Sequence, residues 1–344
     1  MKKLRIFVLM HKDLVPPEGA DGPSDRQIPP WQTEHDVCAT LTALGHEVQP
    51  LGVADDPGVI RDAVINGKPN VIFNLLEEFH GLGMYVPFVL GYLELMRQPY
   101  TGCNPGALLL TRNKALMKKL LRFHRVPTPN FMLVPVGRAV RRPATLPFPL
   151  IVKSTTEHGS VGISQASVVH DDEKLRERVS FIHETLPSDA IVEEFVDGRE
   201  VYVGLIGNQR LETFPLWEMD FGNLPDGSAR IATEKVKWDV GYQNRTGIRT
   251  HAAANLPDGA AERIVTLAKR AYKLFGQTGY SRMDFRVTES GKVYLLESNP
   301  NPHLAITEDF AESAKAVGVE YPQLLQRILQ LGLSYLPGWK DAES

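Results

Sequence analysis

The sequence predicts an α/β fold whose C-terminal part is α+β. In the first hundred residues, apolar strand patterns alternate with helical patterns, an order typical of a parallel sheet with helices on its faces. Beyond residue 150, several strand patterns follow one another with glycine-bearing turns between them. A chain of 344 residues is long enough for two or three domains.

The N-terminal third alternates strands and helices. Apolar runs predict strands at 4–10, 46–53, 70–76 and, more briefly, 99–102. Helical spacing of apolar residues predicts helices at 31–44, 57–66 and 85–97, and Gly45 follows the first of them where a C-cap belongs. The proline-rich segment 11–30 is too long for a structural loop of a compact domain, so we expect a lid or disorder there.

The middle of the chain begins with a helix and continues into strands. The helix covers 114–123, with Asn113 available as its cap, and 126–129 stops it. Residues 138–149 look like a connector. A helix is expected at 171–184, and strands are expected at 150–153, 163–169, 191–196, 200–206 and 210–215.

The last part has one unclear stretch and one strong helix. Residues 225–255 show no clear periodicity, but they carry a basic cluster around Lys235, Lys237 and Trp238. Pro257 and Asp258 then open an amphipathic helix that Gly276 closes.

Residues 280–302 form the most informative segment. Two alternating runs meet at Ser290–Gly291, which predicts a two-residue hairpin turn. That turn places Asp284 opposite Glu297 and Arg282 opposite Asn299. The other face of the hairpin then collects mostly apolar residues, namely Met283, Phe285 and Val287 against Ser298, Leu296 and Tyr294.

Two opposed carboxylates need a positive charge between them. Like charges directly opposite each other destabilise a sheet. Carboxylate and amide oxygens suit Mg²⁺, which usually shares its shell with substrate phosphates. The alternative is a solvated hairpin face on which Arg282 neutralises both acids, and this segment alone leaves both interpretations open.

Other signals are weak when taken singly. The small residues between Lys153 and Gly162 can close around phosphate oxygens, but a plain turn is the better interpretation. Taken alone, the segment 191–200 is better interpreted as an edge strand with exposed acids, and Lys114 could be one more exposed helix lysine. His80 follows a buried strand, where α/β sheets place ligands, although a lone histidine is more often structural.

Composition excludes several classes of function. The formal net charge is −3, so nucleic acid and anionic membrane are not the expected partners. Apolar runs stay shorter than the ~18 residues of a membrane span. With only Cys38 and Cys103, neither a disulfide framework nor a cysteine zinc site can form. We expect a soluble, cytoplasmic protein.

Over nearly the whole chain, the order and spacing of these motifs resemble the ATP-grasp superfamily, and specifically its D-alanine–D-alanine ligase branch. The strongest part is the pattern Arg-x-Asp … Leu-Leu-Glu-x-Asn at Arg282, Asp284, Glu297 and Asn299. The resemblance implies that the last three hold two Mg²⁺ ions on ATP, with Mn²⁺ as an alternative. It also implies domains at 1–105 (Rossmann-like), 106–190 (central ATP-grasp) and 191–344 (C-terminal ATP-grasp with the metal site).

The resemblance assigns further roles by similarity. Contacts to ATP phosphates are implied for Lys114 and Lys153, and a phosphate-covering loop for Ser160 with the Gly159–Gly162 backbone. The implied adenine-reading strand is Glu193, Glu194, Phe195 and Val196, with Glu200 on the ribose. Lys237 resembles the basic residue of a mobile loop that closes over the γ-phosphate.

Substrate residues are implied in the same way. Glu34 resembles the acid that holds the ammonium of the first amino acid, and His80 resembles the histidine near its carboxylate. Arg282 could stabilise the oxyanion of the reaction. The catalytic residues expected are therefore Arg282, Lys237, Glu34 and Ser160.

The implied activity is an ATP-dependent carboxylate–amine ligase that releases ADP and phosphate through an acyl phosphate. A kinase on the same scaffold and a non-catalytic nucleotide-binding regulator are the alternatives. The expected partners are small carboxylates and amines, such as amino acids or peptides, and a homodimer is possible. Three departures concern the substrates: Met10-His11-Lys12 replaces a glycine-rich turn, Ser154 replaces proline, and 300–304 replaces the segment that receives the second D-alanine.

Overall fold

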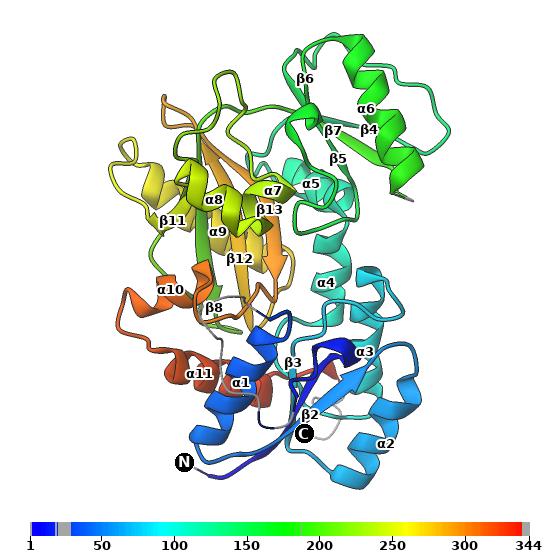
Figure 1. Ribbon diagram of the computed structural model, residues 1–344, viewed down its shortest axis with the longest axis vertical. Coiled ribbons are helices and arrows are strands. Elements are labelled where there is room, and N and C mark those ends of the chain that lie inside the picture. The colour runs from blue at the N-terminus through cyan, green and yellow to red at the C-terminus, as the bar shows by residue number, and fades with distance from the viewer. Residues whose placement is uncertain (1, 18, 20–28, 187, 339–344) are drawn as a thin grey trace.

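The computed structural model describes residues 2–17, 19, 29–186 and 188–338. It contains three sheets, and Figure 1 shows them in three parts arranged along the long axis of the molecule. Half of the predicted 11–30 loop, residues 18 and 20–28, lies outside the described residues.

The first sheet is parallel and has helices on both faces, as predicted. Its order is β2-β1-β3, with β1 at Arg5–His11, β2 at Glu47–Val53 and β3 at Val71–Asn74. Alternate residues of β1 enter different cores, since Ile6 packs with α1 (Gln32–Ala43) and α11 (Tyr321–Ser334), whereas Phe7 packs with α2 (Pro57–Gly67) and α3 (Val86–Leu95). The predicted strand at 99–102 is wrong, because only a single bridge joins Tyr100 to Ile72.

Two consecutive helices connect this part to the next (Figure 1). The sequence did not predict α4 (Pro105–Arg112). It did predict α5 (Lys114–Phe123) with its cap, since the Asn113 side chain accepts a hydrogen bond from the Leu116 N–H at 2.9 Å. Short 3-10 turns lie elsewhere, at Lys12–Leu14, Gly83–Tyr85 and Gln165–Ser167.

The second sheet is antiparallel, in the order β4-β7-β5-β6, and α6 (Asp172–Thr185) covers it. Its strands are β4 (Phe131–Val134), β5 (Leu150–Ser154), β6 (Val168–Val169) and β7 (Ala190–Glu194). The strand predicted at 163–169 shrinks to the two residues of β6. The preceding 3-10 turn, Gln165–Ser167, is capped by Ser164, whose backbone N–H donates to the Ser167 hydroxyl. These residues therefore make no ladder pairs with β5.

The third sheet is antiparallel, in the order β11-β10-β8-β12-β13, with β9 paired to β8. Its strands are β8 (Arg199–Ile206), β9 (Glu212–Thr213), β10 (Trp217–Asp220), β11 (Arg249–Ala252), β12 (Tyr280–Val287) and β13 (Val293–Pro300). The predicted amphipathic helix is α9 (Ala260–Leu274), which packs on β8, β12 and β13 through Ile264 and Ala268. The strand predicted at 210–215 is reduced to β9.

The hairpin of β12 and β13 has the predicted register at its functional end and a different one near its turn. Asp284 pairs with Glu297 and Arg282 with Asn299, as predicted. The predicted two-residue turn is wrong, because the loop spans 288–292, and Val287 pairs with Val293. A bulge between Asp284 and Phe285 takes up the one-residue difference.

Because of the bulge, the side chains of β13 nearest the turn face the opposite side of the sheet from the one predicted. Leu295 and Val293, rather than the predicted Leu296 and Tyr294, enter the core beside Phe285 and Val287. Leu296 lines a cavity instead.

Several elements were not foreseen from the sequence. The stretch without periodicity contains α7 (Glu234–Trp238) and α8 (Val240–Thr246). The chain ends with α10 (Asp309–Lys315) and α11, and α11 returns to pack against α1 and β3 of the first sheet. The predicted domain boundaries stay predictions. Among the described residues, no helix has the length and apolar character that crossing a membrane requires.

Candidate functional site

A small cavity of about 70 Å³ lies between the second and third sheets. Its lining residues include members of β5 and β7 on one side and of β8, β12 and β13 on the other. Ten residues that the sequence singled out line this cavity: Lys153, Ser160, Glu193, Glu194, Phe195, Val196, Glu200, Lys237, Asp284 and Glu297. Residues up to 144 positions apart in the sequence are therefore brought to one place.

A buried charge cluster forms the floor of the cavity. The Glu193 Oε2 atom lies 3.4 Å from the Lys153 Nζ atom and 3.4 Å from the Lys118 Nζ atom. Lys118 also donates a hydrogen bond to Thr128 Oγ1 at 3.0 Å. Sequence reasoning missed Lys118, although a signal existed: Lys114 and Lys118 lie on the same face of α5 as the buried Met117.

The cluster holds two lysines and one glutamate, so it carries a net charge of +1. Burial and the Glu193 charge act on the lysine pKa values in opposite directions. Burial lowers the pKa of Lys118, while Glu193 works against that effect. For Lys153, burial would lower the pKa, but Glu193 and Glu297 outweigh it and raise the pKa. Lys153 therefore stays protonated beside the cavity. The second oxygen of Glu193, Oε1, is buried and has no hydrogen-bond partner among the residues that the structure describes, so it is available to accept a hydrogen bond from a ligand.

Each carboxylate of the hairpin faces a positive charge. Arg282 holds Asp284 with two hydrogen bonds, from Nε to Oδ1 at 2.8 Å and from Nη2 to Oδ2 at 3.1 Å. The Asn299 side chain donates to Asp284 Oδ2 at 3.0 Å. Lys114 Nζ lies 3.1 Å from Glu297 Oε1. Burial would raise the pKa of Glu297, but Lys114 and Lys153 outweigh it and lower the pKa, so this carboxylate is ionised.

This donor set fits a magnesium ion that binds together with a phosphate. Mg²⁺ commonly uses one or two carboxylates and takes its other ligands from substrate phosphates and water. Asp284 and Glu297 are opposed on neighbouring strands, and the Asn299 side chain lies against Asp284. Groups of three or more His, Cys, Asp or Glu side chains placed to hold a metal do not occur in the described part of the chain. A site of two acids therefore depends on ligand oxygens to complete it.

Lys114 connects the hairpin to the glycine-bearing loop. Its Nζ atom donates to the carbonyl oxygen of Glu157, and its backbone N–H donates to the Thr155 carbonyl oxygen at 2.9 Å. His158 of the same loop, which the sequence reading did not single out, lies 3.2 Å through Nε2 from the Arg112 carbonyl oxygen. Burial, together with Lys114, lowers the pKa of His158 to about 3, so its imidazole is neutral.

Over the cavity, the glycine-bearing loop meets the segment 232–238, which includes α7, and two hydrogen bonds join them. The Ser160 hydroxyl donates to the Ala232 carbonyl oxygen at 2.6 Å, and Trp238 Nε1 donates to the Gly159 carbonyl oxygen at 2.9 Å. Ser160 adopts φ of 64°, a left-handed conformation that is uncommon for a residue with a side chain. Ligand pockets usually measure ~300–1,000 Å³, so the cavity as it stands is smaller than a typical ligand pocket.

Glu200 is held in place by residues that the sequence analysis did not select. Arg286 Nη2 donates to Glu200 Oε2 at 2.8 Å, and the Tyr202 hydroxyl donates to Glu200 Oε1 at 2.9 Å. Arg286 also lines the cavity. Glu194, at the end of β7, accepts a hydrogen bond from the Asn130 side chain at 3.0 Å.

Glu34 and His80 lie outside this cavity, in the N-terminal part. Glu34, on α1, is 5% exposed, and its Oε2 atom has no hydrogen-bond partner. Burial, followed by the charge of Glu77, raises the pKa of Glu34 to about 7. His80 is an exposed turn residue with φ of 56°, and its backbone N–H donates to the Ala54 carbonyl oxygen at 2.6 Å. Within the part of the chain that the structure describes, His80 and Glu34 share no hydrogen bond or ion pair.

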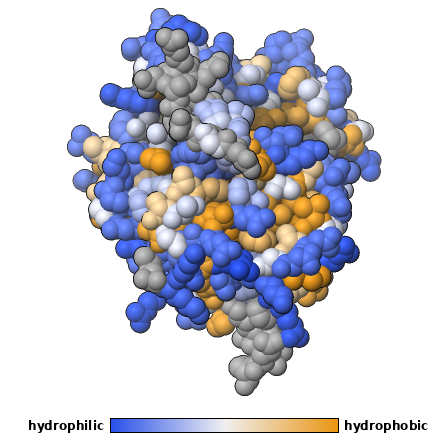
Figure 2. Space-filling view, turned by 60° about the horizontal axis from the view of Figure 1, so that its bottom comes forward, coloured by the Kyte–Doolittle hydropathy of each residue, from blue (hydrophilic) through white to orange (hydrophobic). Residues whose placement is uncertain are grey.

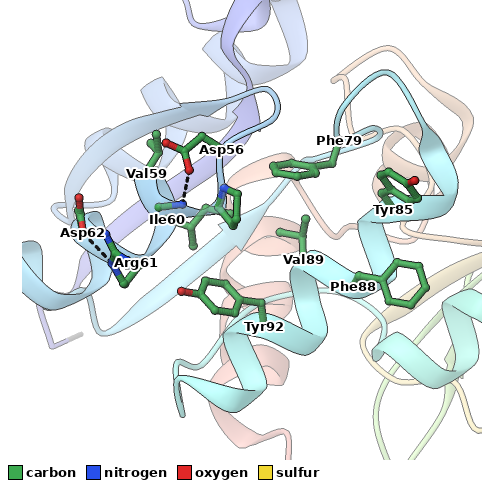
Figure 3. Close-up of a pocket in the computed structure, with 12 residues that line it drawn as sticks. Asp56, Val59, Ile60, Arg61, Asp62, Phe79, Tyr85, Phe88, Val89 and Tyr92 are labelled. Atoms are coloured by element: carbon green, nitrogen blue, oxygen red, sulfur yellow. Dashed lines mark hydrogen bonds and ion pairs between the residues drawn. The ribbon is translucent and has the colours of Figure 1, made fainter.

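A second, larger cavity of about 710 Å³ lies between α2 and α3. Figure 3 shows Phe79, Tyr85, Phe88 and Tyr92 along its wall. Its one basic side chain, Arg61, is paired with Asp62 at 2.9 Å. Figure 2 shows apolar patches interrupting a largely hydrophilic face of the molecule. The cavity lacks the lysines and opposed acids of the first site, and sequence reasoning did not foresee it.

Comparisons with known proteins agree with this geometry. A family model described as "D-ala D-ala ligase C-terminus" matches residues 122–330. The uncharacterized protein y4sG of Sinorhizobium fredii is 30% identical over 88% of both chains. The D-alanine–D-alanine ligase of Pelotomaculum thermopropionicum is 28% identical over 71% of this chain and 75% of its own.

Solved structures show the same fold. The D-alanine–D-alanine ligase of Bacillus anthracis, solved in complex with ATP, superposes with a TM-score of 0.73 at 21% identity. The match covers 99% of this chain and 100% of the other. The architecture is therefore an ATP-grasp fold of the D-alanine–D-alanine ligase type, as the sequence resemblance implied.

Proposed function

The chain belongs to the family of the D-ala D-ala ligase C-terminus, and from that premise we propose that it is an ATP-dependent carboxylate–amine ligase. One observation carries the proposal: two lysines and two opposed carboxylates share the cavity region between the sheets, namely Lys114, Lys153, Asp284 and Glu297. A non-catalytic nucleotide-binding protein seldom needs both acids.

ATP would bind between the two sheets. Lys153 and Lys114 would contact its phosphates, because both ammonium groups lie beside Glu297 at one end of the cavity. The unpartnered Glu193 Oε1 atom would accept a hydrogen bond from the amino group of adenine. Glu194, Phe195 and Val196 would border the base, and Glu200 would face the ribose.

The two hairpin acids would hold the metal. Asp284, Glu297 and Asn299 would bind Mg²⁺, in the form of two ions as the family resemblance implies, or Mn²⁺ in its place. Bound there, the metal would neutralise charge on the phosphates during transfer. Arg282 and Lys114, which balance these acids in the structure, would then be released to face substrate and phosphate.

The reaction follows from the charges of its reactants. A carboxylate oxygen attacks the γ-phosphorus of ATP, the bond to the β-phosphate oxygen breaks, and ADP leaves. Two anions approach each other in this step, so positive charge from Lys114, Lys153 and Lys237 lowers its barrier. A neutral amine nitrogen then attacks the acyl carbon, the bond from that carbon to the phosphate oxygen breaks, and the proton lost by the nitrogen leaves with the phosphate. Arg282 stabilises the negative oxygen of the tetrahedral state.

The two covering loops would protect the acyl phosphate from water. Water hydrolyses such an intermediate readily, so its site must exclude solvent during the reaction. Ser160 lies on the glycine-bearing loop, whereas Lys237, which was expected on a mobile loop, lies on the short helix α7, and both side chains line the cavity. Their contacts through Ala232 and Trp238 would re-form after the substrates bind.

The substrates would be small carboxylates and amines of the amino-acid or peptide class. The homologues named D-alanine–D-alanine ligase support that class at about 30% identity or less. The changed segment after Asn299 argues against assigning two D-alanines to this chain. Glu34 is proposed to hold a substrate ammonium group. His80, which is exposed and outside the cavity, remains a weaker candidate for the carboxylate.

A panel assay tests the proposal. Purified protein, ATP and Mg²⁺ are incubated with pairs of D- and L-amino acids and dipeptides, and ADP and new amides are measured by mass spectrometry. The ligase predicts ADP and an amide in equal amounts for at least one pair. A stable phosphorylated product formed without an amine would identify the rival kinase, and nucleotide binding without any turnover would identify a regulator.

A further inference from the structure

Arg112 is a positively charged residue to which the proposed reaction gives no role. It ends α4, two positions before Lys114. Within the part of the chain that the structure describes, no carboxylate oxygen lies within 4.0 Å of its guanidinium nitrogens. Lys114, Lys153 and Arg282 each have such a partner, so Arg112 differs from them.

The guanidinium of Arg112 has unused hydrogen-bonding capacity. Its Nη2 atom lies 3.5 Å from the Glu77 carbonyl oxygen, at the long limit of a hydrogen bond. Its Nε atom is buried and has no hydrogen-bond partner among the described residues. A buried charged donor without an acceptor is costly, so a ligand oxygen that accepts from it would be stabilised. The residue as a whole is half-buried, so it is not sealed from solvent.

Nearby acids compensate the charge of Arg112 only in part. Burial lowers the pKa of its guanidinium, and Glu77 and Glu157, which lie beyond ion-pair distance, work against that effect without overcoming it. Arginine nonetheless stays protonated at neutral pH. The positive charge is therefore retained in a partly buried place, where contact with an anion would be favourable.

Arg112 and Lys114 contact different parts of the molecule. Lys114 Nζ lies beside Glu297 of β13, where the phosphates and the metal are proposed to bind. Arg112 instead meets the loop between β3 and α3, and it lies so close to Gly83 that a Cβ atom there would be 2.6 Å from Nη1. The carboxylate that attacks the γ-phosphorus belongs beside Lys114. An anion on Arg112 is therefore a different group.

The loop that Arg112 contacts lies at the edge of the first sheet where a ligand is expected. Open α/β sheets bind ligands outside the carboxyl ends of their strands, at the point where the strand order reverses. In the order β2-β1-β3, that point lies between β1 and β3. Glu77 and Gly83 follow the carboxyl end of β3, at Asn74. Arg112 thus brings a positive charge from α4 to this edge.

We propose that Arg112 holds a second acidic group of the carboxylate substrate, which is then an acidic amino acid or a derivative of one. This inference rests on the proposed ligase function and narrows its substrate class. One carboxylate attacks the γ-phosphorus beside Lys114, and the other accepts hydrogen bonds from the Arg112 guanidinium, whose planar donors match a carboxylate. Bond making and breaking are those of the proposed reaction, in which Arg112 determines specificity and takes no covalent part.

Pairs of isosteric probes test the inference by calorimetric titration of the full chain near neutral pH. Glutamate is compared with glutamine, and aspartate with asparagine, each in the D and the L configuration. The amide matches the carboxylate in shape but carries no charge. For at least one pair, we expect the acid to bind at least about tenfold more tightly than its amide.

A matched pair of arginine variants locates the effect. Arg112→Gln is expected to lower the affinity of the preferred acid about tenfold and to change that of its amide less than about twofold. Arg141→Gln removes an exposed arginine of the connector at 138–149 and should change neither affinity.

A pair of glycine variants repeats the test without removing the charge. In Gly83→Ala, the added methyl group would push the flexible end of Arg112 aside, so part of the preference for the acid should be lost. Gly91→Ala is the control, because a Cβ atom there meets no side chain or distant backbone of the described residues within 4 Å. These variants keep the test decisive should Arg112→Gln melt at a lower temperature than the parent.

Three results would overturn the inference. Equal binding of acid and amide in every pair would remove the role of the second charge. An equal loss of acid and amide affinity in Arg112→Gln would assign Arg112 a structural role instead. Absence of acid binding at millimolar concentration would also reject it. ADP and amide formation are scored separately in the amino-acid panel, so an enzyme that ligates only monocarboxylic substrates rejects this inference and leaves the ligase proposal standing.

Discussion

Lys118 shows how a side chain with no exposed surface can influence the chemistry of the site. It shares the Glu193 carboxylate with Lys153, and it donates to Thr128. Without Lys118, Glu193 would be neutralised by Lys153 alone. The net charge of the cluster, which is available to attract ATP phosphates, would then fall from +1 to zero.

We predict that Lys118→Met raises the KM for ATP about tenfold while kcat changes less than about twofold, because ground-state binding is what is lost. The neighbouring exposed Lys119→Met serves as the control. Steady-state kinetics with varied ATP measures both constants. An unchanged KM for ATP in Lys118→Met would show that the cluster does not act on the nucleotide.

Glu34 gives a prediction about stability and pH. Its pKa rises from 4.5 in the unfolded chain to about 7 in the folded one, chiefly because it is buried. The folded state therefore binds more protons between these values, and stability falls as pH rises through them. Glu34→Gln should gain up to about 3 kcal/mol in free energy of unfolding, relative to the parent, between pH 4 and pH 8.

Urea unfolding at several pH values measures that gain. Glu289→Gln, in the exposed hairpin loop, is the matched control. A difference between Glu34→Gln and the parent that stays constant with pH would contradict the account of this buried carboxylate.

At the scale of residues, the sequence predicted side chains whose neighbours along the chain reveal their role. Asp284 and Glu297 were found because a hairpin pattern opposes them. Lys118 and Arg286 were missed because a single charge in a helix or strand is usually exposed, and their burial depends on contacts with distant strands. His158 was missed because it lies in a loop, and its contact with the Arg112 carbonyl oxygen joins residues 46 positions apart.

At the scale of elements, the hairpin has its predicted register at Asp284 because two departures from the prediction cancel each other. The loop at 288–292 is longer than the predicted turn, and the bulge beside Asp284 restores the pairing. Long periodic elements such as α9 were predictable, because burial of one face determines them. Short elements such as β6, β9 and α7 depend on tertiary contacts, which periodicity does not record.

The two covering loops form a latch that can be tested. Trp238→Phe removes the indole N–H that donates to Gly159 and keeps an aromatic ring. Since such a hydrogen bond contributes ~0.5–1.5 kcal/mol, we expect phosphate release without amide formation to rise up to about tenfold. Val240→Ala, an exposed change on α8, is the control. Equal coupling of phosphate release to amide formation in Trp238→Phe and the parent would reject the latch.

At the scale of the whole molecule, local charge matters more than the total. The net charge of −3 describes the whole chain, yet it conceals the lysines and opposed acids between the sheets. The alternation of strands and helices predicted the first sheet. The return of α11 to that sheet could not be predicted, because an amphipathic helix does not specify its distant partner.

The central claim is that Asp284 and Glu297 serve ATP-dependent chemistry and do not merely balance Arg282 and Lys114. ATP turnover in the presence of Mg²⁺ and the active substrate pair is measured for Asp284→Asn, Glu297→Gln and the control Glu289→Gln, with circular dichroism as a check of folding. The account predicts folded proteins in which the first two lose at least about a hundredfold in kcat, while Glu289→Gln keeps the parent rate. Full turnover in either Asp284→Asn or Glu297→Gln would contradict it.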